Sequence, residues 1–206
     1  MKKTNIIAMT IALTCSCIAV NAQDTKQPQA VNADVAKPNS EQAAMEKAWM
    51  AYMTPGPMHE MLAKCNGDWK EDITMWMAPG APPTKSTSVC SNTMILGGRY
   101  QQSTHKGDFN GMPFEGISTV AYDNALKMYI STWIDNMGTG IMYMKGTFNE
   151  KNHMLTSTGK MVDPMTGKEI NVRETFKFVD DNKQVMEMFE TREGKERKTM
   201  EITYTR

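Results

Sequence analysis

Five charged residues lie within β-prone runs of the sequence, where a charge needs either a partner or a purpose. They are Arg99, Glu115, Asp135, Arg173 and Glu174. Trp69, Tyr100 and Trp133 would supply apolar contact beside them. Pockets for small molecules are mostly apolar with a few placed polar groups, so this set predicts a ligand site where the strands converge. The alternative is that the arginines pair with the carboxylates as structural ion pairs.

Methionine is the second unusual feature, with 21 in 206 residues. Three pairs read Met-x-Met within predicted strands, at 75–77, 142–144 and 186–188. A period of two puts each pair on one face of its strand. Thioethers are soft ligands that select Cu(I), so Met75, Met77, Met142 and Met144 form an alternative copper site. The preferred interpretation is packing, since methionine fills cores and lines cavities for apolar ligands.

Catalytic and cofactor patterns are sparse. The histidines, His59, His105 and His153, are scattered, and their spacing supports no Ser-His-Asp or Cys-His-Asn arrangement. Zinc is not predicted because there is no CxxC motif and no histidine pair. Haem is not predicted because no histidine lies in the middle of a predicted strand, so the sequence predicts no cofactor. An enzyme using Glu115 or Asp135 as acid or base is a third hypothesis, ranked below binding.

The elements that must position these residues are β-strands. Ten candidate strands follow one another with short, turn-like connections: 68–77, 87–94, 99–106, 114–123, 127–135, 139–149, 154–162, 169–179, 184–191 and 197–205. No helix lies between them, so the sheet cannot be parallel, which would need crossover helices. A twisted meander of this size removes its exposed edges by closing. The sequence therefore predicts an all-β fold, an antiparallel up-and-down β-barrel of about ten strands over residues 66–206.

Two short α-helices are predicted before the barrel, within residues 41–65. Ser40 can cap the first, whose apolar residues recur at helical spacing up to Met53. The run Thr54-Pro55-Gly56-Pro57 breaks it, and a second helix containing His59 follows. These helices are expected to cover one end of the barrel.

Several motifs together resemble a bacterial family known as domain of unknown function 1579. They are Thr54-Pro55-Gly56-Pro57-x-His59, Gly67-x-Trp69, Ile95-Leu96-Gly97-Gly98-Arg99, Pro113-Phe114-Glu115-Gly116, Ala121-Tyr122-Asp123-Asn124, Trp133-x-Asp135 with Gly138-Thr139-Gly140, and the ending Lys198-Thr199-Met200-Glu201-Ile202-x-Tyr204-Thr205-Arg206. The match covers about residues 45–206. The resemblance implies a lipocalin-like, or calycin-like, barrel and carries over no activity, ligand or catalytic residue.

The N-terminus is typical of an export signal. Lys2 and Lys3 precede an apolar run, and small residues end at Ala22, which predicts a signal peptide over residues 1–22. Residues 23–40 are polar and form a flexible leader. Lipid anchoring at Cys15 or Cys17 is disfavoured, since neither has a leucine three residues before it. We therefore expect a periplasmic or secreted protein, without a stable membrane span.

Export leaves two cysteines, Cys65 and Cys90, which either pair as a disulfide or remain separate buried thiols. The formal net charge is zero, with 23 basic and 23 acidic residues, and no basic stripe indicates a nucleic-acid partner. The sequence predicts no oligomeric state.

The leading hypothesis is therefore an exported barrel that binds a small hydrophobic or amphipathic molecule. Its aromatic and methionine side chains would contact the ligand, and Arg99 with its carboxylate partners would orient it. This hypothesis predicts that Arg99→Ala lowers ligand affinity while the barrel still folds.

Overall fold

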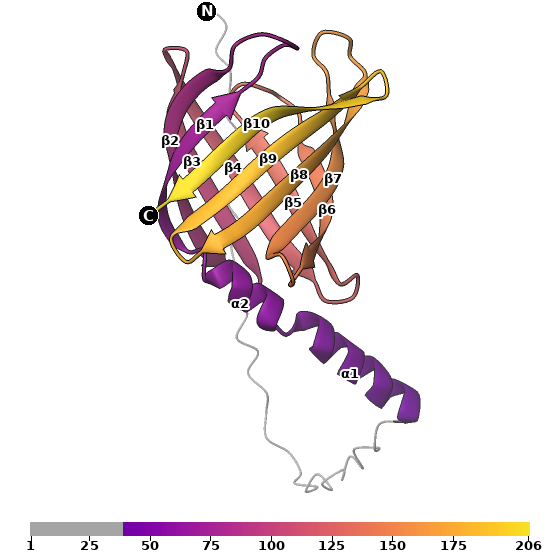
Figure 1. Ribbon diagram of the computed structural model, residues 1–206. Coiled ribbons are helices and arrows are strands. Elements are labelled where there is room, and N and C mark those ends of the chain that lie inside the picture. Colours follow the sequence, from indigo (N-terminus) through magenta and orange to yellow (C-terminus); the bar gives the residue numbers. More distant parts are fainter. Residues whose placement is uncertain (1–38) are drawn as a thin grey trace, which may run out of the picture. The chain divides into compact units, whose positions relative to one another are not determined.

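The protein folds as a closed antiparallel β-barrel of ten strands (Figure 1). The computed structural model describes residues 39–206. Two helices precede the strands, α1 (Ser40–Met53) and α2 (Pro57–Ala63). The strands are β1 (Gly67–Met75), β2 (Thr84–Ile95), β3 (Tyr100–Phe109), β4 (Met112–Asp123), β5 (Met128–Asp135), β6 (Met142–Asn149), β7 (Met154–Val162), β8 (Glu169–Asp180), β9 (Lys183–Arg192) and β10 (Lys195–Thr205). The predicted fold class and strand number are confirmed.

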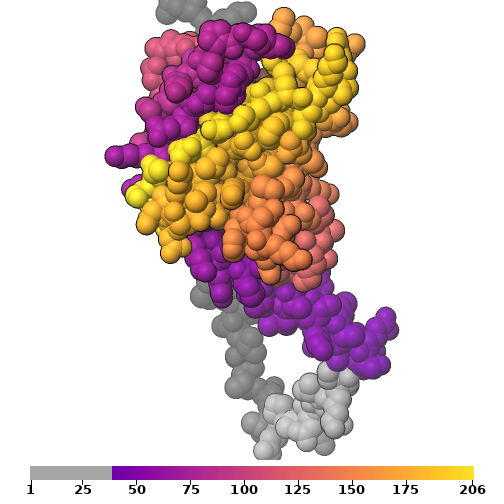
Figure 2. Space-filling view, viewed as in Figure 1, coloured from indigo at the N-terminus to yellow at the C-terminus, as the bar shows by residue number. Residues whose placement is uncertain are grey.

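Each strand pairs with the next along the chain, and β10 closes the barrel by pairing with β1. Tight hairpins make this connectivity possible. Asn110 and Gly111 join β3 to β4, and Glu193 and Gly194 join β9 to β10; all four have positive φ angles. Two successive residues with positive φ form the hairpin turn whose twist matches that of the flanking strands. Figure 2 shows the C-terminal strands, in orange and yellow, as a continuous outer wall.

Alternation along the strands separates an inner from an outer face. The inner face carries the apolar core, which contains Trp69, Cys90, Met186, Ile202 and Tyr204. On β8, Val172 is only 2% exposed, which makes the face it shares with Phe176 and Phe178 the inner one. A period of two allows every strand to contribute to this core while its other face meets solvent.

Helix α2 closes one end of the barrel through its backbone. The side chain of Gln101 donates a hydrogen bond to the Leu62 carbonyl at 2.6 Å, and the Tyr129 hydroxyl donates to the Met58 carbonyl at 3.2 Å. His59 is buried at this end and its ring meets Tyr122 edge-on. These hydrogen bonds from barrel side chains to the α2 backbone hold the helix against this end of the barrel.

Helix α1 has no buried residue. Its N-cap is Asn39, whose side chain accepts a hydrogen bond from the Gln42 amide at 2.7 Å, so the prediction of Ser40 as the cap was wrong by one position. Either side chain can cap a helix, and sequence does not decide between neighbours. Among the described helices, neither is long and apolar enough to cross a membrane.

Candidate functional site

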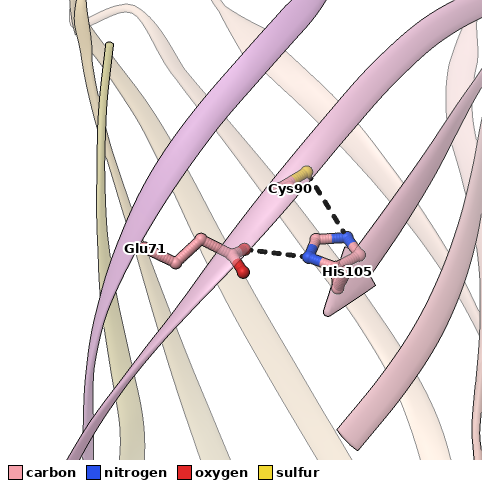
Figure 3. Close-up of side chains that lie close together, drawn as sticks. All are labelled: Glu71, Cys90 and His105. Carbon is pink, nitrogen blue, oxygen red and sulfur yellow. Dashed lines mark hydrogen bonds and ion pairs between the residues drawn. The ribbon is translucent and has the colours of Figure 1, made fainter. Parts of the chain in front are cut away.

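A buried polar cluster lies inside the barrel, formed by Glu71 on β1, Cys90 on β2 and His105 on β3 (Figure 3), with Ser88 of β2 beside Glu71. Strand register brings them together, since Glu71 is paired with Ser88 and Cys90 with His105. All four alternate onto the inner face. Glu71 is 1% exposed, Cys90 2% and His105 8%. The cluster therefore sits away from bulk water.

His105 joins the carboxylate and the thiol through its two ring nitrogens. Its Nδ1 lies 2.8 Å from Glu71 Oε1, and its Nε2 lies 3.8 Å from Cys90 Sγ (Figure 3). Ser88 donates a further hydrogen bond to Glu71 Oε2. A carboxylate oxygen accepts hydrogen bonds, so the tautomer that suits this geometry has its hydrogen on Nδ1 and turns the Nε2 lone pair toward the thiol.

The thiol of Cys90 is held in its protonated form. Burial, together with the nearby negative charge of Glu71, raises the pKa of Cys90 to about 12. The thiol has a second acceptor in Asn92 Oδ1, at 3.1 Å. The thiolate is the nucleophilic form of cysteine, so the raised pKa of Cys90 disfavours it as a nucleophile.

A second interior feature is the carboxyl of Glu174 on β8. Its cross-strand neighbours are Ser157, which is buried, and Met188, which packs on the core. Burial raises the pKa of Glu174 to about 7. Within the described residues, no hydrogen bond or ion pair involves its carboxyl group. Its side chain is only partly buried by the surrounding residues, so it keeps some accessible surface.

Trp133 and Asp135 lie on the inner face near the end opposite α2. The Trp133 indole N–H donates to Asp135 Oδ2 at 2.6 Å, and its ring meets that of His105 edge-on with centroids 5.0 Å apart. Trp133 also stacks on Phe114. These contacts fix the indole beside the buried cluster.

The predicted ligand residues do not converge, and the expectation that they share one barrel end was wrong. Trp69, Trp133 and Asp135 face inward, with the Trp69 indole N–H donating to the Cys65 carbonyl at 2.9 Å. Arg99 and Tyr100 are exposed at the β2–β3 turn, where Arg99 donates to the Leu96 carbonyl. The alternation of residues along a strand shows which side chains share a face, but it does not show which face points into the barrel.

Three residues of that set remain: Glu174 faces inward, and the other two lie on the outer face. Glu115 is exposed and lies 3.4 Å from Lys106. Arg173 pairs with Glu196 at 2.7 Å, and its guanidinium lies over the Phe189 ring. Arg173 therefore forms a structural ion pair, as the alternative hypothesis predicted. Its partner, Glu196, was not among the residues that the sequence singled out.

The four methionines of the copper hypothesis are also divided. Met144 is 1% exposed inside the barrel, and Met142 shares its face on β6. Met77 is 61% exposed and lies beyond the end of β1, whose last residue is Met75. The Met75–Met77 pair is therefore not held on one strand face, and the proposed four-sulfur set is incomplete in this conformation.

The disulfide alternative is not realised, since both cysteines of the described chain are free. The Cys65 thiol, after α2, accepts a hydrogen bond from the Gln184 side chain at 3.2 Å. The Cys90 thiol points to Asn92 and His105 instead. The second alternative, two separate buried thiols, is confirmed.

Sequence reasoning missed Glu71, Ser88 and His105 as a site. His105 was placed at the end of a strand, whereas β3 continues to Phe109 and puts it well inside. Ser88, Cys90 and Asn92 are buried on one face of β2, but the residues between them are also small, so the sequence alone did not mark the inner face. Their partners on β1 and β3 could be named only once the register was known.

Comparison with known proteins supports the fold. A family model described as "Protein of unknown function (DUF1579)" matches residues 54–206. The crystal structure of Rv2717c from M. tuberculosis is similar, with a TM-score of 0.56 and 12% sequence identity, over 74% of this chain and 99% of that chain. At this identity the likeness shows the fold alone. No curated protein matches the sequence.

Proposed function

The chain belongs to the DUF1579 family, whose function is unknown, so the family itself indicates no activity. We propose that the barrel binds a small amphipathic molecule in its interior. The observation that carries this proposal is Glu174, an inward-facing carboxyl that keeps some accessible surface and has no partner among the described residues. A buried polar group without a partner costs about 1–3 kcal/mol. A ligand that donates a hydrogen bond to Glu174 recovers this cost.

The ligand's polar group follows from the chemistry of that carboxyl. A carboxyl with a pKa of about 7 is partly ionised at neutral pH, and its ionised form only accepts hydrogen bonds. An amine or another N–H donor is therefore the preferred partner. Met188 next to Glu174, and Phe176 two residues further along β8, supply apolar contact for the rest of the molecule. Flexible methionine side chains accommodate apolar ligands of varied shape.

The route into the barrel is the end opposite α2. No described helix lies across that end (Figure 1), whereas α2 is bonded to the other end through Gln101 and Tyr129. Binding in the mouth or lumen of a β-barrel is a common arrangement for small ligands. Here the floor would be the α2 end and the mouth would lie near Asp135.

The test is fluorescence titration of the purified protein with N-phenyl-1-naphthylamine, an apolar probe with one N–H group. We expect saturable enhancement, displaced by hexadecylamine more effectively than by palmitate. Glu174→Gln should weaken the amine about tenfold, which corresponds to about 1.4 kcal/mol. The control Glu115→Gln, on the outer face, should leave binding unchanged. No saturable signal, preference for palmitate, or equal effects of the two variants would refute the proposal.

We further propose that the protein is exported, on the strength of the signal-like residues 1–22, which lie outside the described residues. Cleavage should leave Gln23 at the N-terminus. Fractionation of a producing bacterium, with N-terminal sequencing of the periplasmic protein, tests this. A cytoplasmic full-length chain would contradict export without bearing on ligand binding.

A further inference from the structure

We infer that Cys90 and His105 form a binding site for a single thiophilic metal ion of the Zn²⁺ or Cu(I) type, with Glu71 as the outer partner of the histidine. The site is independent of the proposed ligand anchor at Glu174. It rests on the placement of three side chains on three successive strands.

The distance between the two donor atoms fits one ion. Cys90 Sγ and His105 Nε2 are 3.8 Å apart. Metal bonds of about 2.3 Å to sulfur and about 2.1 Å to nitrogen sum to more than this distance, so an ion can bond both at a bent angle. The side chains need no large movement to reach it. Asn92 Oδ1 lies 3.1 Å from the same sulfur and is a candidate third metal ligand.

The second nitrogen of the imidazole is already arranged as in a metal site. His105 Nδ1 lies 2.8 Å from Glu71 Oε1, and Ser88 bonds the other carboxylate oxygen. Histidine ligands almost always donate their other N–H to a carboxylate, carbonyl or water, which fixes the tautomer and orients the ring. This interaction leaves Nε2 with a free lone pair, aimed at the thiol.

Charge also favours a cation. Glu71 is 1% exposed, and no lysine or arginine pairs with it among residues 39–206. When the metal binds, the S–H bond of Cys90 breaks, the proton passes to solvent and an S–metal bond forms, without electron transfer. The bound ion then brings positive charge to a buried group of anionic oxygen and sulfur.

Soft thiolate and imidazole ligands suit both Zn²⁺ and Cu(I), so the experiment separates them. The reduced, metal-free protein is titrated with Co²⁺, which substitutes for Zn²⁺ and gives a sulfur-to-cobalt absorption band, followed by displacement with Zn²⁺. A parallel anaerobic titration uses Cu(I) in competition with bicinchoninate. One ion per chain is expected from at least one titration.

The variants assign the ligands. Cys90→Ser and His105→Gln should abolish binding, and Glu71→Gln should weaken it by about 10–100-fold, the usual effect of losing an outer partner. The matched control is Cys65→Ser, which removes the other buried free thiol and should bind normally. Circular dichroism checks that each variant folds.

A readout on the unaltered protein covers the case in which a variant fails to fold. Bound metal should slow alkylation of Cys90 by iodoacetamide and leave Cys65 unaffected, as followed by peptide mass spectrometry. The inference is overturned by a wild-type protein with two reduced thiols that takes up neither ion. It is also overturned if Met144→Leu abolishes Cu(I) binding while Cys90→Ser does not. Neither result alters the amine test at Glu174.

Discussion

Glu71 and Glu174 face the same barrel interior from β1 and β8, but among residues 39–206 only Glu71 has hydrogen-bonding partners. His105 and Ser88 occupy both oxygens of Glu71, whereas the described residues offer Glu174 no hydrogen bond. One carboxyl is therefore part of a hydrogen-bonded cluster, and the other has no partner among the described residues.

Stability should depend on pH through Glu174. Its pKa is raised from 4.5 to about 7 by burial, so the folded protein retains this proton to higher pH than the unfolded chain. The stabilising contribution of the protonated Glu174 carboxyl to the free energy of unfolding is fully present below pH 4.5. It is lost as the pH rises through about 7. The loss amounts to about 3 kcal/mol at most.

Glu174→Gln should remove this dependence. Urea unfolding at pH 4 and pH 8 is the measurement: wild type and variant should agree at low pH, and the variant should be more stable at high pH. Glu115→Gln, on the exposed outer face, is the control. A variant that is less stable than wild type at pH 8 would contradict the assignment.

The bond between His105 and Glu71 should matter for folding. His105→Ala leaves a buried carboxylate without its principal partner and should cost about 3 kcal/mol. Glu71→Gln keeps an oxygen acceptor for Nδ1–H and should cost about 1–2 kcal/mol. Chemical denaturation should give this order. His153→Asn, in an exposed turn with positive φ, should be nearly neutral, since asparagine tolerates that conformation.

The position of Trp133 should depend on Gly116. A Cβ atom at Gly116 would overlap the indole ring of Trp133, so Gly116→Ala should displace that ring and cost about 1–3 kcal/mol. Near-ultraviolet circular dichroism should change with it. Gly138→Ala is the control. The nearest atom to its new Cβ is Asp135 Oδ1 at 3.8 Å, which is an ordinary contact, so this variant should retain the wild-type near-ultraviolet spectrum.

Cys65 and Cys90 should react as thiols without prior reduction. Ellman's reagent should titrate both in denaturant and neither quickly in the native state, since both are buried. Burial raises the pKa of each thiol, which further slows native reaction. A chain whose thiols appear only after reduction would show a disulfide instead.

The sequence was sufficient for the barrel because its signals are local. Hairpins such as Asn110-Gly111 depend on neighbouring residues, and the alternation of Ile170, Val172 and Phe176 has a period of two regardless of what lies opposite. The break at Thr54–Pro57 likewise follows from proline geometry, and α2 begins at Pro57. Local chemistry therefore predicted ten strands, two helices and their order.

Only the closed barrel decided which charged residues lie inside. Arg99, Glu115 and Arg173 looked equivalent to Asp135 and Glu174 in sequence, because alternation does not say which face is inner. The cluster of Glu71, Cys90 and His105 joins residues up to 34 positions apart, through the registers of β1 with β2 and β2 with β3. A one-residue shift in either register would turn one member outward. The packing of the whole barrel fixes that register.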